Sequence, residues 1–134
     1  MQNVKRTYKL FLDDIRNPIH AYEYTRWEGF LKDDWLIVRD YEQFVNTVEM
    51  KWETHNAFPE IIAFDHDLAD EHYNAPVHSD FKERTGYDCA TWLIDFCIDN
   101  KLIIPSWICH SMNPVGRDNI NMILKNFKRF QNES

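Results

Sequence analysis

Acidic and histidine residues follow short apolar runs at three places along the chain, and these residue types could do chemistry. The three groups are Asp13 with Asp14, Asp65-His66-Asp67, and His110 with Ser111. The mostly apolar runs before them, 9–12, 61–64 and 106–109, predict buried strands whose polar residues emerge at the strand end. Parallel strands present their carboxyl ends at one edge of a sheet, so we predict that the three groups form one site.

The aspartates of this predicted site are candidate metal ligands. Carboxylates crowded at a sheet edge repel one another unless a cation or a proton intervenes. A Mg²⁺ ion held by Asp13 or Asp14 together with Asp65 or Asp67 would relieve the repulsion, because this ion prefers hard oxygen ligands. The alternative is that one aspartate caps a helix, another bonds an arginine and the rest are solvated. The sequence leaves both interpretations open.

A second candidate feature is an anion site between Ser111 and Arg117, where a strand end runs into a helix start. Free amides and the positive end of the helix dipole attract phosphate at such a position, and an arginine there can form bidentate hydrogen bonds with it. The candidate phosphate-binding residues are Arg16, Ser111, Asn113, Gly116 and Arg117. The alternative makes Asn113 only a helix cap and Arg117 an ordinary surface residue.

The elements that must position these residues alternate along the chain. A further strand is predicted over 35–38, and helices are predicted after Asp40, after Thr85 and after Asn113, each a typical capping residue. Alternating strands and helices, with continuously apolar strands, predict an α/β three-layer sandwich. Its sheet would be short, mostly parallel and of about four strands, with helices on both faces.

Two loops complete the predicted order of elements. The segment from Leu68 to Arg84 is polar and shows neither helical nor strand period, and long loops of this kind are usually functional or mobile. Its His72 and His78 could close over a ligand or bind metal weakly, or simply be solvated. Trp27, in the loop after the first strand, is a candidate for stacking a base.

Length and charge narrow the class of protein. The 134 residues predict one domain spanning 1–134, and the net charge of -7 excludes a broad nucleic-acid-binding surface of the kind that needs many Lys and Arg contacts. A nucleic-acid end or a small nucleotide remains a possible partner. The first 20 residues are polar, and no apolar run reaches transmembrane length. We therefore expect a cytoplasmic protein without membrane contact.

The three cysteines lack the spacing of a zinc site. Cys89 and Cys97 lie eight residues apart in a predicted helix, so we interpret them as reduced core thiols. Cys109 precedes His110 and could be a nucleophile. Strand alternation, however, would point its side chain away from His110.

Four ordered motifs resemble those of a known family. They are Leu10–Pro18, Phe64–Leu68, Thr85–Asp88 and His110–Arg117. The chain resembles response-regulator receivers, and more closely the cyclic-phosphate processing receiver-like domains. The resemblance implies a flavodoxin-like receiver fold that is truncated after its fourth strand and helix, without the fifth strand and its lysine. It also implies a link to cyclic phosphates and RNA repair.

By the same resemblance, Asp13 and Asp14 match the acidic pair of receivers and Asp65 matches their phosphoacceptor, while Ser111 takes roughly the position of their hydroxyl residue. In the receiver-like strand order, His66 and His110 would end neighbouring strands and could face each other across one pocket. One neutral and one protonated imidazole would then form an acid-base pair, with Asp65 or Asp67 orienting His66. A structural hydrogen-bonding role is the alternative for either histidine.

Three functions are compatible with these residues. The leading hypothesis is a phosphoesterase that processes a cyclic phosphate on an RNA end or a nucleotide derivative, with His66, His110, Asp65 and Asp67 as catalytic residues. A receiver that accepts phosphate on Asp65 is the second. The third is a nucleotide-binding or sequestering protein without catalysis. The sequence does not fix the oligomeric state.

Overall fold

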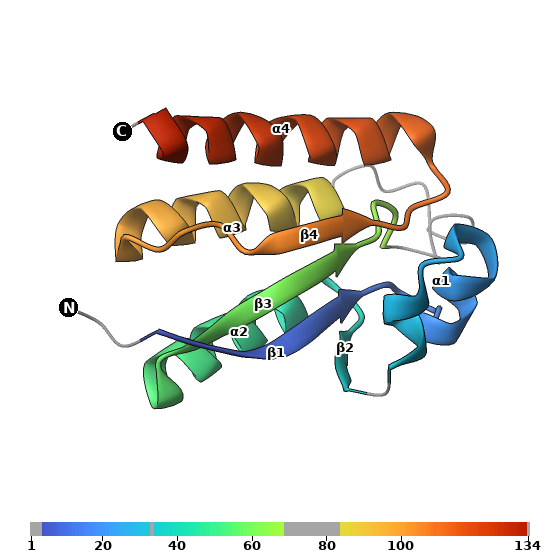
Figure 1. Ribbon diagram of the computed structural model, residues 1–134, viewed down its shortest axis with the longest axis horizontal. Helices are drawn as coiled ribbons and strands as arrows, with labels where there is room; N and C mark the ends of the chain where they lie inside the picture. Colours follow the sequence, from blue (N-terminus) through green and yellow to red (C-terminus); the bar gives the residue numbers. More distant parts are fainter. Residues whose placement is uncertain (1–3, 33, 69–83, 134) are drawn as a thin grey trace, which may run out of the picture.

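A parallel four-stranded sheet lies at the centre of the part of the chain that the structure describes (Figure 1). The computed structural model describes residues 4–32, 34–68 and 84–133. The strands are β1 (Lys5–Leu12), β2 (Trp35–Val38), β3 (Ala57–Phe64) and β4 (Ser106–Cys109), in the order β2-β1-β3-β4. All neighbours pair in parallel, so the four carboxyl ends share one edge. The predicted sheet is confirmed.

Helical elements connect the strands. They are α1 (Pro18–Thr25), the 3-10 turn η1 (Glu28–Leu31), α2 (Tyr41–His55), α3 (Gly86–Asn100) and α4 (Pro114–Glu133). The sequence predicted α2, α3 and α4 but treated the segment that contains α1 and η1 as a loop, which is wrong. None of the helices in the described part of the chain combines the length and apolar character needed to cross a lipid bilayer.

Strand alternation divides the core into two apolar clusters, one on each face of the sheet. Leu10, Leu12 and Phe64 belong to the larger cluster, which also contains the buried faces of α2, α3 and α4. Phe11 and Ala63 belong to the smaller cluster, together with residues of α1 and η1. Successive strand residues point to opposite faces, so this division follows from the sequence. The three-layer α/β arrangement with helices on both faces is confirmed.

The helix starts follow the predicted capping chemistry. Asp40 accepts a hydrogen bond from the Gln43 amide at 2.8 Å. Thr85 and Asp88 form a capping box before α3. Asp40 therefore caps α2, although it also follows a strand end.

Two apolar residues at helical spacing with the buried residues of α3 and α4 are exposed. Ile98 of α3 is 57% exposed, and Phe130 of α4 is 64% exposed although its ring stacks on Phe127. In α3 the buried stripe runs through Leu93 and Cys97, so Ile98 lies one position past that stripe. Both Ile98 and Phe130 lie at the edge of the apolar face of their helices, where helical spacing alone does not decide whether a side chain is buried.

Gly86, the first residue of α3, lets that helix approach the carboxyl end of β3. A Cβ atom at this position would lie 1.7 Å from the backbone oxygen of Asp65. The Gly86 amide also donates to the His66 carbonyl oxygen at 2.8 Å. Glycine at this position therefore joins α3 to the segment that carries the candidate site residues.

We predict that Gly86→Ala lowers the free energy of unfolding by about 1–3 kcal/mol or more, because the clash forces backbone apart. Alanine in place of glycine within a helix normally raises the free energy of unfolding by roughly 0.5–1 kcal/mol. A decrease in Gly86→Ala would therefore indicate the clash by its sign alone. Urea denaturation measures the effect, with Asp95→Ala on the exposed side of α3 as control. A Gly86→Ala variant as stable as the native protein would contradict the close approach.

Candidate functional site

Three carboxylates meet at the shared carboxyl edge of the strands. Asp13, Asp14 and Asp65 each offer an oxygen atom, and these oxygens lie within 4.8 Å of one another. Backbone hydrogen bonds between neighbouring strands continue past the strand ends. The Asp13 amide donates to the carbonyl oxygen of Val38 at 3.1 Å, and the Asp65 amide donates to the carbonyl oxygen of Leu12 at 3.0 Å. The sheet itself therefore sets the positions of Asp13 and Asp65, which are both buried.

Burial and charge act differently on the two buried carboxyls. Burial, reinforced by the charge of Asp13, raises the pKa of Asp65 to about 7. Burial alone would also raise the pKa of Asp13. The hydrogen bond from His110 and the amides of Arg16 and Ile15 outweigh burial, so the pKa of Asp13 is lowered. Asp13 is thus ionised at neutral pH, whereas Asp65 shares its site with a proton.

This donor set fits a divalent cation. Three carboxylate oxygens are hard ligands of the type that Mg²⁺ prefers. Burial is the main cause of the raised pKa of Asp65, and the charges of Asp13 and Asp14 add to it, so a cation bound here would take the place of the proton on Asp65. Asp13, Asp14 and Asp65 would hold such an ion.

His110 lies beneath the acidic cluster, which we define as Asp13, Asp14 and Asp65. Its Nε2 is 3.0 Å from Asp13 Oδ2, and its ring stacks on Phe11 with centroids 4.6 Å apart. The side chain is 1% exposed, and burial lowers its pKa, so the imidazole is neutral. The ionised Asp13 can only accept, so Nε2 carries the proton. His110 is therefore a positioning residue that holds the Asp13 carboxylate.

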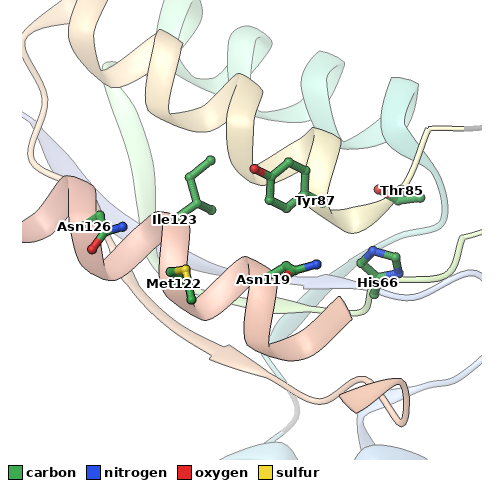
Figure 2. Close-up of a pocket in the computed structure, with 7 residues that line it drawn as sticks. All are labelled: His66, Thr85, Tyr87, Asn119, Met122, Ile123 and Asn126. Carbon is green, nitrogen blue, oxygen red and sulfur yellow. The ribbon is translucent and has the colours of Figure 1, made fainter. Parts of the chain in front are cut away.

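His66 lies elsewhere, between the starts of α3 and α4 (Figure 2). Its Nδ1 is 2.9 Å from Asp67 Oδ1, while its backbone amide donates to Asp65 Oδ1 at 2.9 Å. The predicted face-to-face pair of His66 and His110 is wrong, because His110 packs in the smaller cluster under β1. Asp67, in contrast, does contact His66 as the sequence suggested.

The segment from Ser111 to Arg117 forms a capped helix start. The Ser111 hydroxyl oxygen accepts from the Asn113 amide, and the Asn113 side-chain oxygen accepts from the Gly116 amide, both at 3.1 Å. Pro114 has no amide hydrogen. The amides of Asn113, Gly116 and Arg117 are thus occupied, Pro114 has none, and Asn113 acts as a cap. The guanidinium of Arg117 lies 4.0 Å from the Asp118 carboxylate.

Gly116 has a role that the sequence did not suggest. A Cβ atom at this position would lie 2.3 Å from Cγ of the His66 ring. The glycine is therefore needed for the close approach of α4 to His66.

Arg16 is the predicted phosphate-binding residue that the structure does bring to the acidic cluster. Its guanidinium lies 3.8 Å from Asp13 Oδ2, hydrogen-bonds Met112 Sδ at 3.7 Å and covers the Tyr24 ring. It is one third exposed, so an incoming phosphate could reach it.

Sequence reasoning missed two residues that shape the site. Arg39 donates to the backbone oxygens of Asp13 and Arg16 and to the Asn17 side chain, which fixes the loop after β1. Arg39 directly follows a predicted strand, and this position could have identified it as a residue of the site. Tyr24 donates to the backbone oxygen of His110 but lies in the helix that was not predicted. Asn17-Pro18 has the same cap-and-proline pattern that identified α4.

The remaining candidates lie outside the site. Trp27 packs edge-on against Phe30 and Trp35. Cys109 donates to the Asn121 side chain, on the face opposite His110, and burial raises the pKa of its thiol to about 12. This excludes a Cys109–His110 nucleophile pair.

The other two cysteines, Cys89 and Cys97, are free and buried. The loop histidines, His72 and His78, lie outside the described residues.

We predict a pH-dependent difference between the native protein and Asp65→Asn. Asp65 keeps its proton up to about pH 7 when folded, but releases it near its ordinary pKa of 3.8 when unfolded. The folded state binds more protons in this window, so native stability falls as the pH rises from about 4 to above 7. Without divalent cations, Asp65→Asn avoids this loss and becomes the more stable protein by about 1–4 kcal/mol.

Urea denaturation in the presence of a chelator, at pH values from 4.5 to 8.5, measures this difference. The exposed variant Asp95→Asn is the control and should follow the native curve. Parallel curves for the native protein and Asp65→Asn would contradict the raised pKa of Asp65.

Comparison with known proteins agrees with this geometry. The family model of the cyclic-phosphate processing receiver domain matches residues 8–126, which include every strand end described above. Searches of curated proteins and of solved structures gave no match. The family match spans most of the chain, and the parallel four-stranded sheet with its helices is a receiver fold. The chain therefore belongs to the family of cyclic-phosphate processing receiver domains.

Proposed function

We propose that the protein is a divalent-cation-dependent phosphoesterase that opens a cyclic phosphate on an RNA end or a nucleotide derivative. The observation that carries the proposal is the convergence of the Asp13, Asp14 and Asp65 oxygens within 4.8 Å. Membership of a family associated with cyclic-phosphate processing supports phosphate as the reacting group. The phosphate would lie between the acidic cluster and His66.

The acidic cluster cannot bind a phosphate anion by itself, since all three groups are carboxylates. A bound divalent cation would neutralise them and polarise a phosphoryl oxygen. Arg16 lies beside Asp13 and is placed to hydrogen-bond a second phosphate oxygen. The substrate phosphate would thus be held from two sides.

His66 is the proton carrier in this proposal. The carboxylate of Asp67 only accepts, so its bond with His66 puts the imidazole proton on Nδ1. The lone pair of Nε2 then takes a proton from the attacking water as the P–O bond to water forms. One ester P–O bond of the ring breaks, its oxygen takes up a proton from bulk water, and a phosphomonoester results; His66 then returns the proton that it removed to bulk water.

His110 supports this reaction without touching the substrate. Its bond to Asp13 keeps that carboxylate ionised and correctly oriented as a ligand. Arg39 holds the loop that carries Asp13 and Arg16 in place, because it donates hydrogen bonds to the backbone oxygens of both residues.

The test is turnover of a panel of 2′,3′-cyclic nucleotides, RNAs with cyclic-phosphate ends and cyclic dinucleotides, with Mg²⁺ or with a chelator. We expect turnover of at least one substrate class, dependent on the cation. Loss of a ligand removes several kcal/mol of transition-state stabilisation, so Asp65→Asn should slow turnover by about 100-fold or more. Failure to turn over any panel member would refute the proposal.

We predict that His66→Ala lowers kcat by about 10²–10⁴-fold, the usual contribution of a general acid or base. The matched control is His55→Ala, which removes an exposed histidine at the end of α2. Full activity of His66→Ala would refute the role of His66 but not the phosphoesterase itself. Mass spectrometry of the products identifies the bond that breaks.

The same acidic cluster favours a second candidate function, a receiver that takes a phosphoryl group on Asp65. Incubation with a small phosphoryl donor and Mg²⁺, followed by intact-mass measurement, separates the two. A stable added phosphoryl group on Asp65, without turnover of the panel, would favour the receiver. Tight binding of an unchanged nucleotide would favour the third candidate, a sequestering protein.

A further inference from the structure

A groove between α3 and α4 begins beside His66 and continues along α4 (Figure 2). Its volume is about 510 Å³, within the range of pockets that hold small ligands. Thr85 and Tyr87 line it from the start of α3, and Asn119, Met122 and Asn126 line it from α4. The groove thus extends away from the place where the proposed function puts the phosphate.

The described lining of the groove contains no Asp, Glu, Lys or Arg side chain. This is unusual in a chain with 28% charged residues and a net charge of -7. Met122 and Ile123 supply apolar surface, whereas Asn119 and Asn126 supply amides. Within the described residues neither amide has a hydrogen-bond partner. These features suit a flat, uncharged group with donors and acceptors at its edge.

The spacing of the lining residues suits a ring system. Asn119 and Asn126 are seven residues apart, so they share one face of α4 and are separated by about 10 Å along it. An asparagine amide offers one donor and one acceptor, the pair that reads the edge of a nucleobase. Tyr87, which is 37% exposed, presents an aromatic ring from the opposite helix, and bases stack on such rings.

We propose that the groove between α3 and α4 binds the nucleobase of the ligand, with Asn119 and Asn126 contacting the base edge and Tyr87 its face. The substrate class is thereby a nucleoside phosphate or a terminal nucleotide rather than a base-free cyclic phosphate. The position of the phosphate rests on the proposed function, whereas recognition of the base does not.

Binding of phosphate-free nucleosides tests the groove on its own. Adenosine, guanosine, cytidine and uridine are titrated into the ¹⁵N-labelled protein, and the side-chain amide signals of Asn119 and Asn126 are followed by NMR. We expect saturable shifts of these signals with at least one nucleoside and none with ribose or inorganic phosphate. Absence of such shifts with all four nucleosides would overturn the proposal, as would shifts confined to residues outside the groove.

Variants of the groove give a second readout. Asn119→Leu and Asn126→Leu remove a hydrogen-bonding pair worth about 1 kcal/mol or more, so each should weaken nucleoside binding roughly 5–10-fold. Asn132→Leu, an exposed asparagine on the same helix outside the groove, is the matched control. Equal affinities for all three variants would overturn the assignment.

The two proposals fail in distinguishable ways. Nucleoside binding without turnover of any cyclic phosphate would leave the base site intact and refute the phosphoesterase. Turnover that is equally efficient for nucleoside and base-free ribose cyclic phosphates, and that is unchanged in Asn119→Leu, would support the phosphoesterase and refute the base site. Where both hold, Asn119→Leu raises KM for cyclic nucleotides and leaves kcat unchanged.

Discussion

The buried pair of Asp13 and His110 is the interaction on which the site depends. It joins the ends of β1 and β4, two strands that are not neighbours, across the end of β3. Because His110 and two backbone amides keep Asp13 ionised, its negative charge acts on Asp65 between them. The hydrogen bond from His110 thus keeps a negative charge next to Asp65, whose pKa burial already raises.

Close packing imposes the second constraint. The chain has three glycines, and each stands where a Cβ atom would meet another group at less than 3 Å. Gly86 meets the Asp65 backbone, Gly116 meets the His66 ring, and Gly29 meets the ring of Trp27. Two of the three therefore bring α3 and α4 against the segment after β3. This approach also places the entrance of the groove beside His66.

Much of this arrangement was predictable from the sequence for simple reasons. Apolar runs identify buried strands, capping residues identify helix starts, and the parallel geometry then requires the acidic residues to meet at one edge. The direction of each histidine ring was not predictable, because His66 and His110 follow the strands, where alternation no longer applies. The helix α1 was missed because it is short and buries mainly Ala21.

The distribution of charge connects the acidic cluster with the groove. A protein with a net charge of -7 repels a long polyanion, and it can hold phosphate only where positive charge is concentrated. Beside the acidic cluster that positive charge comes from Arg16, and a bound cation would add to it. The adjoining groove is uncharged along its described lining, so it neither attracts nor repels further phosphates. If the proposed function and the proposed base site both hold, such a surface would favour a terminal or free nucleotide over the interior of a strand, because only the former presents a single phosphate next to an accessible base.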